Sequence, residues 1–114
     1  MEIAIRSRHI AWNEELRKHV ERSIRFAIDR HKGWIHRMSV YLSDLNGPRG
    51  GVDKVCQITA EICGARPVLI LEIGDDLKAV VSRAARRLRY RVGRRVHRQR
   101  MPQQREYRGT IRAA

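Results

Sequence analysis

Apolar residues recur at every second position in three segments of this 114-residue chain, and this spacing is typical of half-buried β-strands. The three segments are residues 2–8, 35–45 and 54–63. A fourth apolar stretch, residues 68–73, follows the turn formers of residues 64–67 and completes the predicted strands. The last three predicted strands are consecutive, so we expect them to form an antiparallel meander.

A helix is predicted between the first and second strands. Asn13 is followed by two acidic residues, and its side chain can accept hydrogen bonds from the free backbone amides of a helix start. Apolar residues at helical spacing then fill one arc of residues 16–28. The helix should end near residues 31–33, where His-Lys-Gly interrupts the pattern.

A second helix is predicted after the fourth strand. Asp75 or Asp76 caps it, and its apolar residues form an arc that begins at Leu77 and ends at Val92. Arg95 falls in the middle of that arc, so we expect contact between this helix and the core to end near Val92.

The predicted order of elements is βαβββα, which most simply gives an α+β fold with a four-stranded sheet and two helices packed on one face. Residues 1–98 are expected to form one domain, with a flexible hairpin loop at residues 44–53. Residues 99–114 are expected to be a basic disordered tail, because they contain Pro and Gly and lack periodicity. Neither a bilayer-length apolar run nor a signal-peptide pattern occurs, which predicts a cytoplasmic protein.

Positive charge is concentrated in the last third of the chain. Residues 77–114 carry twelve Arg and one Lys against the single acid Glu106, for a net charge of +12, whereas residues 1–76 carry +1. Such a field attracts polyanions. Arg outnumbers Lys twenty-one to four, and the guanidinium fork suits phosphate oxygens, so the composition favours RNA or DNA over a membrane surface.

The sequence offers no pattern for catalysis or cofactor binding. Cys56 and Cys63 lack zinc-site or redox-motif spacing, so both are expected to be reduced thiols that behave as small hydrophobic residues. Of the five histidines, His31 and His36 are close in sequence, but they straddle a predicted helix end and strand start, and no Asp, Glu or Cys completes a tetrahedral metal site with them. Paired carboxylates at residues 14–15 and 75–76 are explained by helix starts. We therefore expect neither an enzyme nor a bound metal, cofactor or small-molecule substrate.

A series of short segments between residues 2 and 96 matches one protein family in order and spacing. The segments are Ile-Ala-Ile-Arg-Ser-Arg-His9, Leu16-Arg-Lys-His-Val20, Val40-Tyr-Leu-Ser-Asp-Leu-Asn-Gly47, Asp53-Lys-Val-Cys56, Asp76-Leu-Lys-Ala-Val80 and Arg87-Leu88. Together they resemble the ribosome hibernation-promoting factor family, also called RaiA-like or sigma-modulation proteins. The resemblance identifies residues 1–98 as a hibernation-factor-like RNA-binding domain.

The resemblance implies a factor that sits between the head and body of the small ribosomal subunit and contacts 16S RNA where messenger and transfer RNAs would lie. It further implies silencing of translation by occupancy during stress, without chemistry. Longer members carry an additional dimerisation domain that pairs ribosomes, so this chain resembles a short-form member. Its oligomeric state stays open.

The predicted RNA-binding residues are arginines on the two helices. The family's basic contact residues carry over onto Arg22, Arg25, Arg86, Arg87, Arg91 and Arg94, and the predicted set also includes Arg83 and Arg95 from the same basic helix. Phe26 and Tyr90 fall at or near positions where family members often have a basic side chain. Tyr90 is expected to cover a neighbouring strand or loop, with stacking on a base as the alternative.

Three other functions are compatible with the charge pattern. The chain could be a general binder of structured RNA or DNA without ribosome specificity, or a regulator whose basic helix docks on an acidic protein. Basic amphipathic helices also bind anionic lipid, but the apolar arc of the second helix lacks Trp and Phe and is rich in small residues. That composition favours packing on a sheet.

Overall fold

The computed structural model of the protein describes residues 2–45 and 53–100. They form strand β1 (Glu2–Arg8), helix α1 (Glu14–Ile28), the 3₁₀ helix η1 (Asp29–Trp34), strands β2 (Ile35–Asp44), β3 (Lys54–Ile62) and β4 (Val68–Gly74), and helix α2 (Leu77–Arg100). The predicted order βαβββα and the α+β class are confirmed. Most of the predicted hairpin loop and residues 101–114 of the predicted tail lie outside the described residues.

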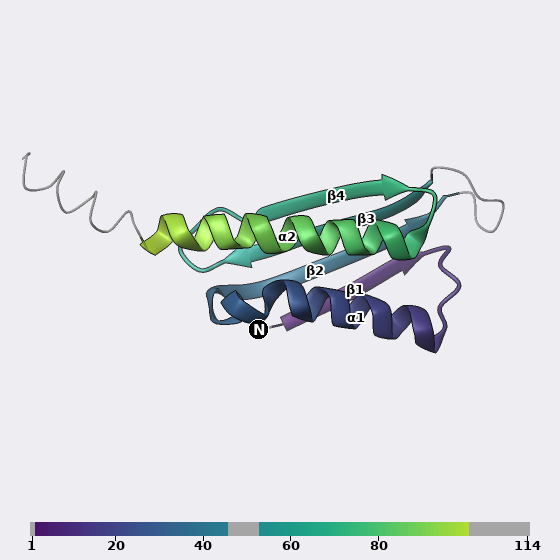
Figure 1. Cartoon of the computed structure of the whole chain (residues 1–114), viewed down its shortest axis with the longest axis horizontal. Helices are drawn as coiled ribbons and strands as arrows, with labels where there is room; N and C mark the ends of the chain where they lie inside the picture. The colour runs from purple at the N-terminus through teal and green to yellow at the C-terminus, as the bar shows by residue number, and fades with distance from the viewer. Residues whose placement is uncertain (1, 46–52, 101–114) are drawn as a thin grey trace, which may run out of the picture.

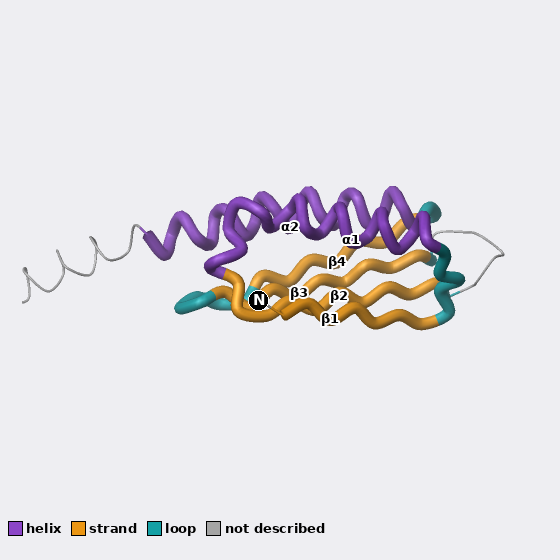
Figure 2. The backbone as a smooth tube through the Cα atoms, turned by 90° about the horizontal axis from the view of Figure 1, so that it is seen from below, coloured by secondary structure: helices purple, strands orange, loops and turns teal. Residues whose placement is uncertain are grey.

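The four strands form one sheet in the order β1-β2-β3-β4. Strand β1 runs parallel to β2, with Ile5 beside Val40, and β2, β3 and β4 form the predicted antiparallel meander. Both helices cover the same face of the sheet and leave the other face open (Figures 1 and 2). On β4 the alternation places Leu69, Leu71 and Ile73 on the open face, where they are about half exposed.

Helix α1 begins at the predicted residue. The backbone of Asn13 is extended, and its Oδ1 accepts a hydrogen bond from the Leu16 amide at 2.7 Å. The α-helix ends at Ile28, earlier than predicted, and the chain continues as η1 to Trp34. As a result Arg30 lies on η1, beside the second half of α2, rather than on a continuous α-helix.

Helix α2 packs closely against β3 and β4. The side chains that face the sheet are aliphatic and often small, and Ala84 and Leu88 are wholly buried. Gly74 at the end of β4 permits the close approach, because a Cβ atom there would lie only 2.7 Å from Val80 Cγ2. The Asp76 carbonyl accepts from the Val80 amide at 2.9 Å, which makes Asp76 the residue at the helix start.

Contact between α2 and the core continues past Val92, so the prediction that it ends there is wrong. Val96 is 1% exposed and belongs to the hydrophobic core. Arg95 does not interrupt this packing, because its side chain reaches sideways and donates hydrogen bonds to the carbonyls of Arg66 and Pro67 at 2.6 and 3.2 Å. The Cα atom of a long polar residue can therefore lie on the apolar side of a helix while its charged group reaches a polar partner outside the core.

The two cysteines are free thiols in different environments. Cys56 is completely buried in the core, as expected of a small hydrophobic residue, whereas Cys63 is exposed and the expectation is wrong there. Burial, and to a lesser degree the charge of Glu72, raises the pKa of Cys56 to about 12.

We expect a thiol reagent such as Ellman's reagent to label Cys63 alone in the native protein at pH 8. Thiolate is the reactive species, and the Cys56 thiol is both inaccessible and protonated at that pH. One thiol per chain should react rapidly in buffer and two in denaturant, counted by absorbance. Rapid labelling of both thiols in the native protein would contradict the placement of Cys56 in the core.

Candidate nucleic-acid interface

Helices α1 and α2 run parallel and form one layer above the sheet (Figures 1 and 2). Three contacts with a common offset of 63 residues hold them in register: Glu15 pairs with Lys78, His19 Nε2 lies 3.1 Å from Ser82 Oγ, and the Arg89 guanidinium lies 4.8 Å from the ring centroid of Phe26.

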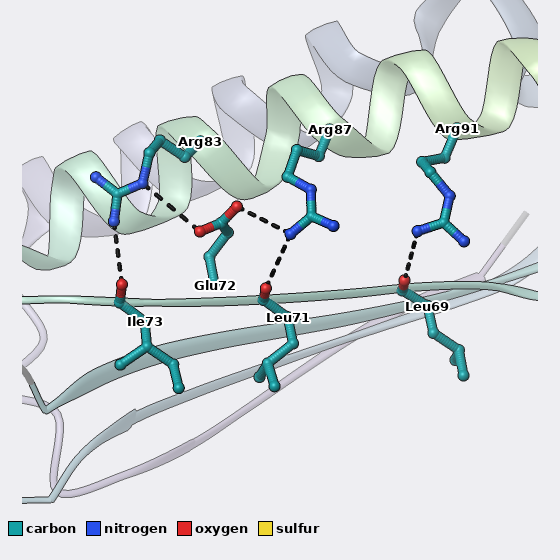
Figure 3. Close-up of polar contacts among 7 residues, drawn as sticks. All are labelled: Leu69, Leu71, Glu72, Ile73, Arg83, Arg87 and Arg91. Carbon is teal, nitrogen blue, oxygen red and sulfur yellow. Dashed lines mark hydrogen bonds and ion pairs between the residues drawn. The ribbon is translucent and has the colours of Figure 1, made fainter.

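Four arginines of α2, spaced four residues apart, reach toward the free edge of β4. We call Arg83, Arg87, Arg91 and Arg95 the edge arginines. The first three donate hydrogen bonds to the carbonyls of Ile73, Leu71 and Leu69 at 3.2, 3.1 and 3.4 Å (Figure 3), and Arg95 continues the series at the turn before β4. Because β4 is an edge strand, these carbonyls have no neighbouring strand to bond with, and the edge arginines satisfy them.

Glu72 is the one carboxylate among the described residues that pairs with arginines of α2. Its Oε1 lies 3.0 Å from Arg87 Nη1 and its Oε2 lies 3.6 Å from Arg83 Nε (Figure 3). The side chains of Arg83 and Arg87 nevertheless remain 43% and 49% exposed. A guanidinium has five N–H donors, so these two side chains keep donors for another partner.

A groove of about 510 Å³ lies on the opposite side of α2, between this helix and η1. We call it the basic groove; five arginines line it (Arg30, Arg86, Arg89, Arg94 and Arg98), with His31, Tyr90, Gly93 and His97 between them. All five arginines are exposed, and none of them forms an ion pair within the described part of the chain. The charge of the groove is therefore available to an external anion.

Crowding of positive charge is visible at the end of α2. Burial, and then the positive charges of Arg66, Arg91 and Arg98, lower the pKa of Arg95. Mutual repulsion of this kind opposes folding in isolation and is relieved when a polyanion binds. The electrostatics thus favour a phosphate-rich partner along this helix.

The eight predicted RNA-binding arginines occupy three different places. Arg86 and Arg94 line the basic groove, and Arg83, Arg87, Arg91 and Arg95 are the edge arginines. The remaining two lie on α1, where both are exposed. Arg25 lines a separate hollow with Ile3 and Ile5 of β1, so the fold does not bring it to the groove.

The fold adds three groove arginines that sequence reasoning left out of the set. Arg89 follows Arg86 by three residues and Arg98 follows Arg94 by four, and this helical spacing from two predicted residues is the signal that could have identified them. Arg30 had no comparable signal, because its position depends on how η1 turns after α1.

Two aromatic side chains lie exposed among these arginines. Tyr90 is 65% exposed, and the Arg94 guanidinium lies 5.7 Å from its ring centroid. Tyr90 therefore does not cover a strand or loop, and that prediction is wrong. Phe26 is 67% exposed, with the guanidinium of Arg89 over its ring.

Within residues 2–45 and 53–100, no three His, Cys, Asp or Glu side chains come close enough together to hold a metal ion. Histidines are dispersed instead, with His19 between the helices and His31 and His97 in the basic groove. None of the helices that the structure describes combines the length and the apolar character that crossing a membrane requires.

Comparisons with known proteins agree with this architecture. The family model described as Sigma 54 modulation protein / S30EA ribosomal protein matches residues 3–100. The N-terminal domain of Protein Y from Thermus thermophilus is 25% identical, with a TM-score of 0.66 over 82% of this chain and 98% of that one. A ribosomal subunit interface protein from Coxiella burnetii shares the fold at 14% identity, with a TM-score of 0.68 over 82% and 96% of the two chains. No curated protein matches the sequence at a significant level.

Proposed function

The chain belongs to the family of sigma 54 modulation proteins and S30EA ribosomal proteins, and on this premise we propose that it binds the small ribosomal subunit through 16S RNA. Bound there, it silences translation by occupying space that messenger and transfer RNA need, and it catalyses no reaction. The names of the two structural relatives, a ribosomal subunit interface protein and a Protein Y domain, support a ribosomal partner.

One observation carries the proposal: the outer surface of the helical layer bears arginines that no carboxylate of the described residues opposes. They are Arg22 on α1, Arg30 on η1, and Arg86, Arg89, Arg94 and Arg98 on α2. Folded RNA is recognised mainly by its shape and its phosphate backbone. A rigid layer with many guanidinium forks suits that mode of recognition.

The proposal predicts a steep salt dependence of binding to purified small subunits. If about six phosphates are contacted, the logarithm of the binding constant should fall with the logarithm of salt concentration with a slope of about −4 to −5. Pelleting of the full chain with small subunits over a series of potassium chloride concentrations measures this slope. A slope near zero would contradict a phosphate-based interface.

Sedimentation of cell extract distinguishes this function from its alternatives. The proposal predicts near-stoichiometric migration of the protein with small subunits. A spread over all nucleic acids would instead indicate a general RNA or DNA binder, and a complex that survives nuclease treatment would indicate an acidic protein partner.

A further inference from the structure

Tyr90 has a large aromatic side chain, yet this side chain lies exposed on the surface of α2. Together with Arg86 it lies between two hollows: the basic groove on one side and, on the other, the hollow lined by Glu72 and the first three edge arginines. Arg86 and Arg94 lie one turn before and one turn after it on the helix. Its ring is 65% exposed and contributes nothing to the buried core of the described residues.

A glycine, Gly93, lines the basic groove next to Tyr90. Gly93 lies within helix α2, where glycine weakens the helix relative to alanine. The packing of the protein does not demand glycine there, because an added Cβ would meet no atom closer than His31 Nε2 at 3.6 Å. Gly93 lines the basic groove, and the absence of a side chain there allows another molecule to approach the helix backbone closely.

An exposed aromatic ring between arginines is the arrangement that proteins use for unpaired nucleotides. Unpaired bases stack on aromatic side chains or guanidinium planes, while the flanking phosphates bind basic residues. Bases within a duplex do not offer their faces in this way. The volume of about 510 Å³ is within the range of roughly 300–1,000 Å³ that is typical of small-ligand sites.

We propose that the basic groove holds one unpaired RNA nucleotide, whose base stacks on Tyr90 and whose neighbouring phosphates contact Arg86, Arg94 and Arg30. This inference rests on the proposed function and specifies the kind of RNA that the site selects. Tyr90 then provides selectivity for single-stranded or bulged positions, and the arginines provide affinity for any phosphate backbone.

The test compares two RNA hairpins that have the same number of phosphates. One carries a single bulged nucleotide, and the other carries an abasic residue at the same position. We expect the full chain to bind the bulged hairpin about tenfold more tightly, measured by fluorescence anisotropy, because one base–aromatic stack contributes an effect of about this size. Tyr90→Phe should retain this preference, whereas Tyr90→Ala and Tyr90→Leu should bind both hairpins equally.

Tyr90 is exposed, so these variants should fold normally, which circular dichroism verifies. Equal binding of both hairpins by the wild-type chain, or a base preference that survives in Tyr90→Ala, would overturn the inference. Gly93→Ala provides a second variant: it should raise the melting temperature yet lower affinity for the bulged hairpin, and an unchanged affinity would also count against the site.

The outcome separates this inference from the proposed function. A chain that binds small subunits with the expected salt slope but ignores the bulged base would leave the proposed function intact and remove the nucleotide site. A chain that shows the base preference but fails to bind small subunits would instead retain the site and refute the ribosomal target.

Discussion

Replacing Arg86 and Arg94 together by Glu should lower affinity for small ribosomal subunits by roughly 100-fold or more at physiological salt. Both side chains line the basic groove, and neither forms an ion pair in the described part of the chain. Each lost charge-assisted contact costs about 1.5 kcal/mol or more, and the introduced carboxylates repel phosphate. Pelleting with purified subunits measures the change, and the melting temperature should stay close to that of the wild type.

Arg6→Glu combined with Arg8→Glu is the matched control. These two arginines lie on β1 with their side chains toward the open face of the sheet, and the substitutions change the net charge by the same amount. This control should weaken only the long-range electrostatic attraction between the protein and RNA. Its affinity should therefore fall far less than that of the variant with Arg86→Glu and Arg94→Glu. Equal losses in the two variants would mean that net charge alone, rather than the helical layer, drives binding.

Leu88→Ala should lower the free energy of unfolding by about 2–5 kcal/mol. Leu88 is 0% exposed between α2 and the sheet, where neighbouring side chains cannot collapse fully into the space that it leaves. Urea denaturation followed by circular dichroism measures the change. The same variant should lose subunit binding only in proportion to the unfolded fraction, because Leu88 does not face the groove.

Leu71→Ala provides the comparison for this stability effect. Leu71 is 53% exposed on the open face of β4, so the same chemical change removes little buried area and should cost less than about 1 kcal/mol. Similar losses in both variants would contradict the placement of the core between helices and sheet.

Local patterns in the sequence predicted most of the fold. The period of two in residues 35–45 and 54–63 identified β2 and β3, because alternation follows directly from strand geometry. Asn13 marked the start of α1, because a side-chain cap depends only on the next few residues. The sequence did not predict that contact between α2 and the core extends to Val96. Arg95 lies within the apolar arc, but its side chain turns away from the core and donates a hydrogen bond to a carbonyl of the turn before β4.

The sequence alone could not show which arginines of α2 contact β4 and which line the basic groove. Arg83, Arg86 and Arg87 carry the same charge within two helical turns, yet two of them reach β4 and one lines the groove. Which side chains meet β4 depends on strand order and helix rotation, and these are set by long-range packing. The spacing of four residues among the edge arginines is a signal, but it acquires meaning only once β4 is known to be an edge strand.

We expect the helical layer, rather than the open face of the sheet, to face ribosomal RNA. A cryo-electron microscopy map of small subunits incubated with the full chain tests it most directly. The map should show α1, η1 and α2 against 16S RNA, with phosphates next to Arg86 and Arg94 and with Leu69, Leu71 and Ile73 turned away from it. Density that places the open face of the sheet against the RNA, or no density on the subunit, would contradict it.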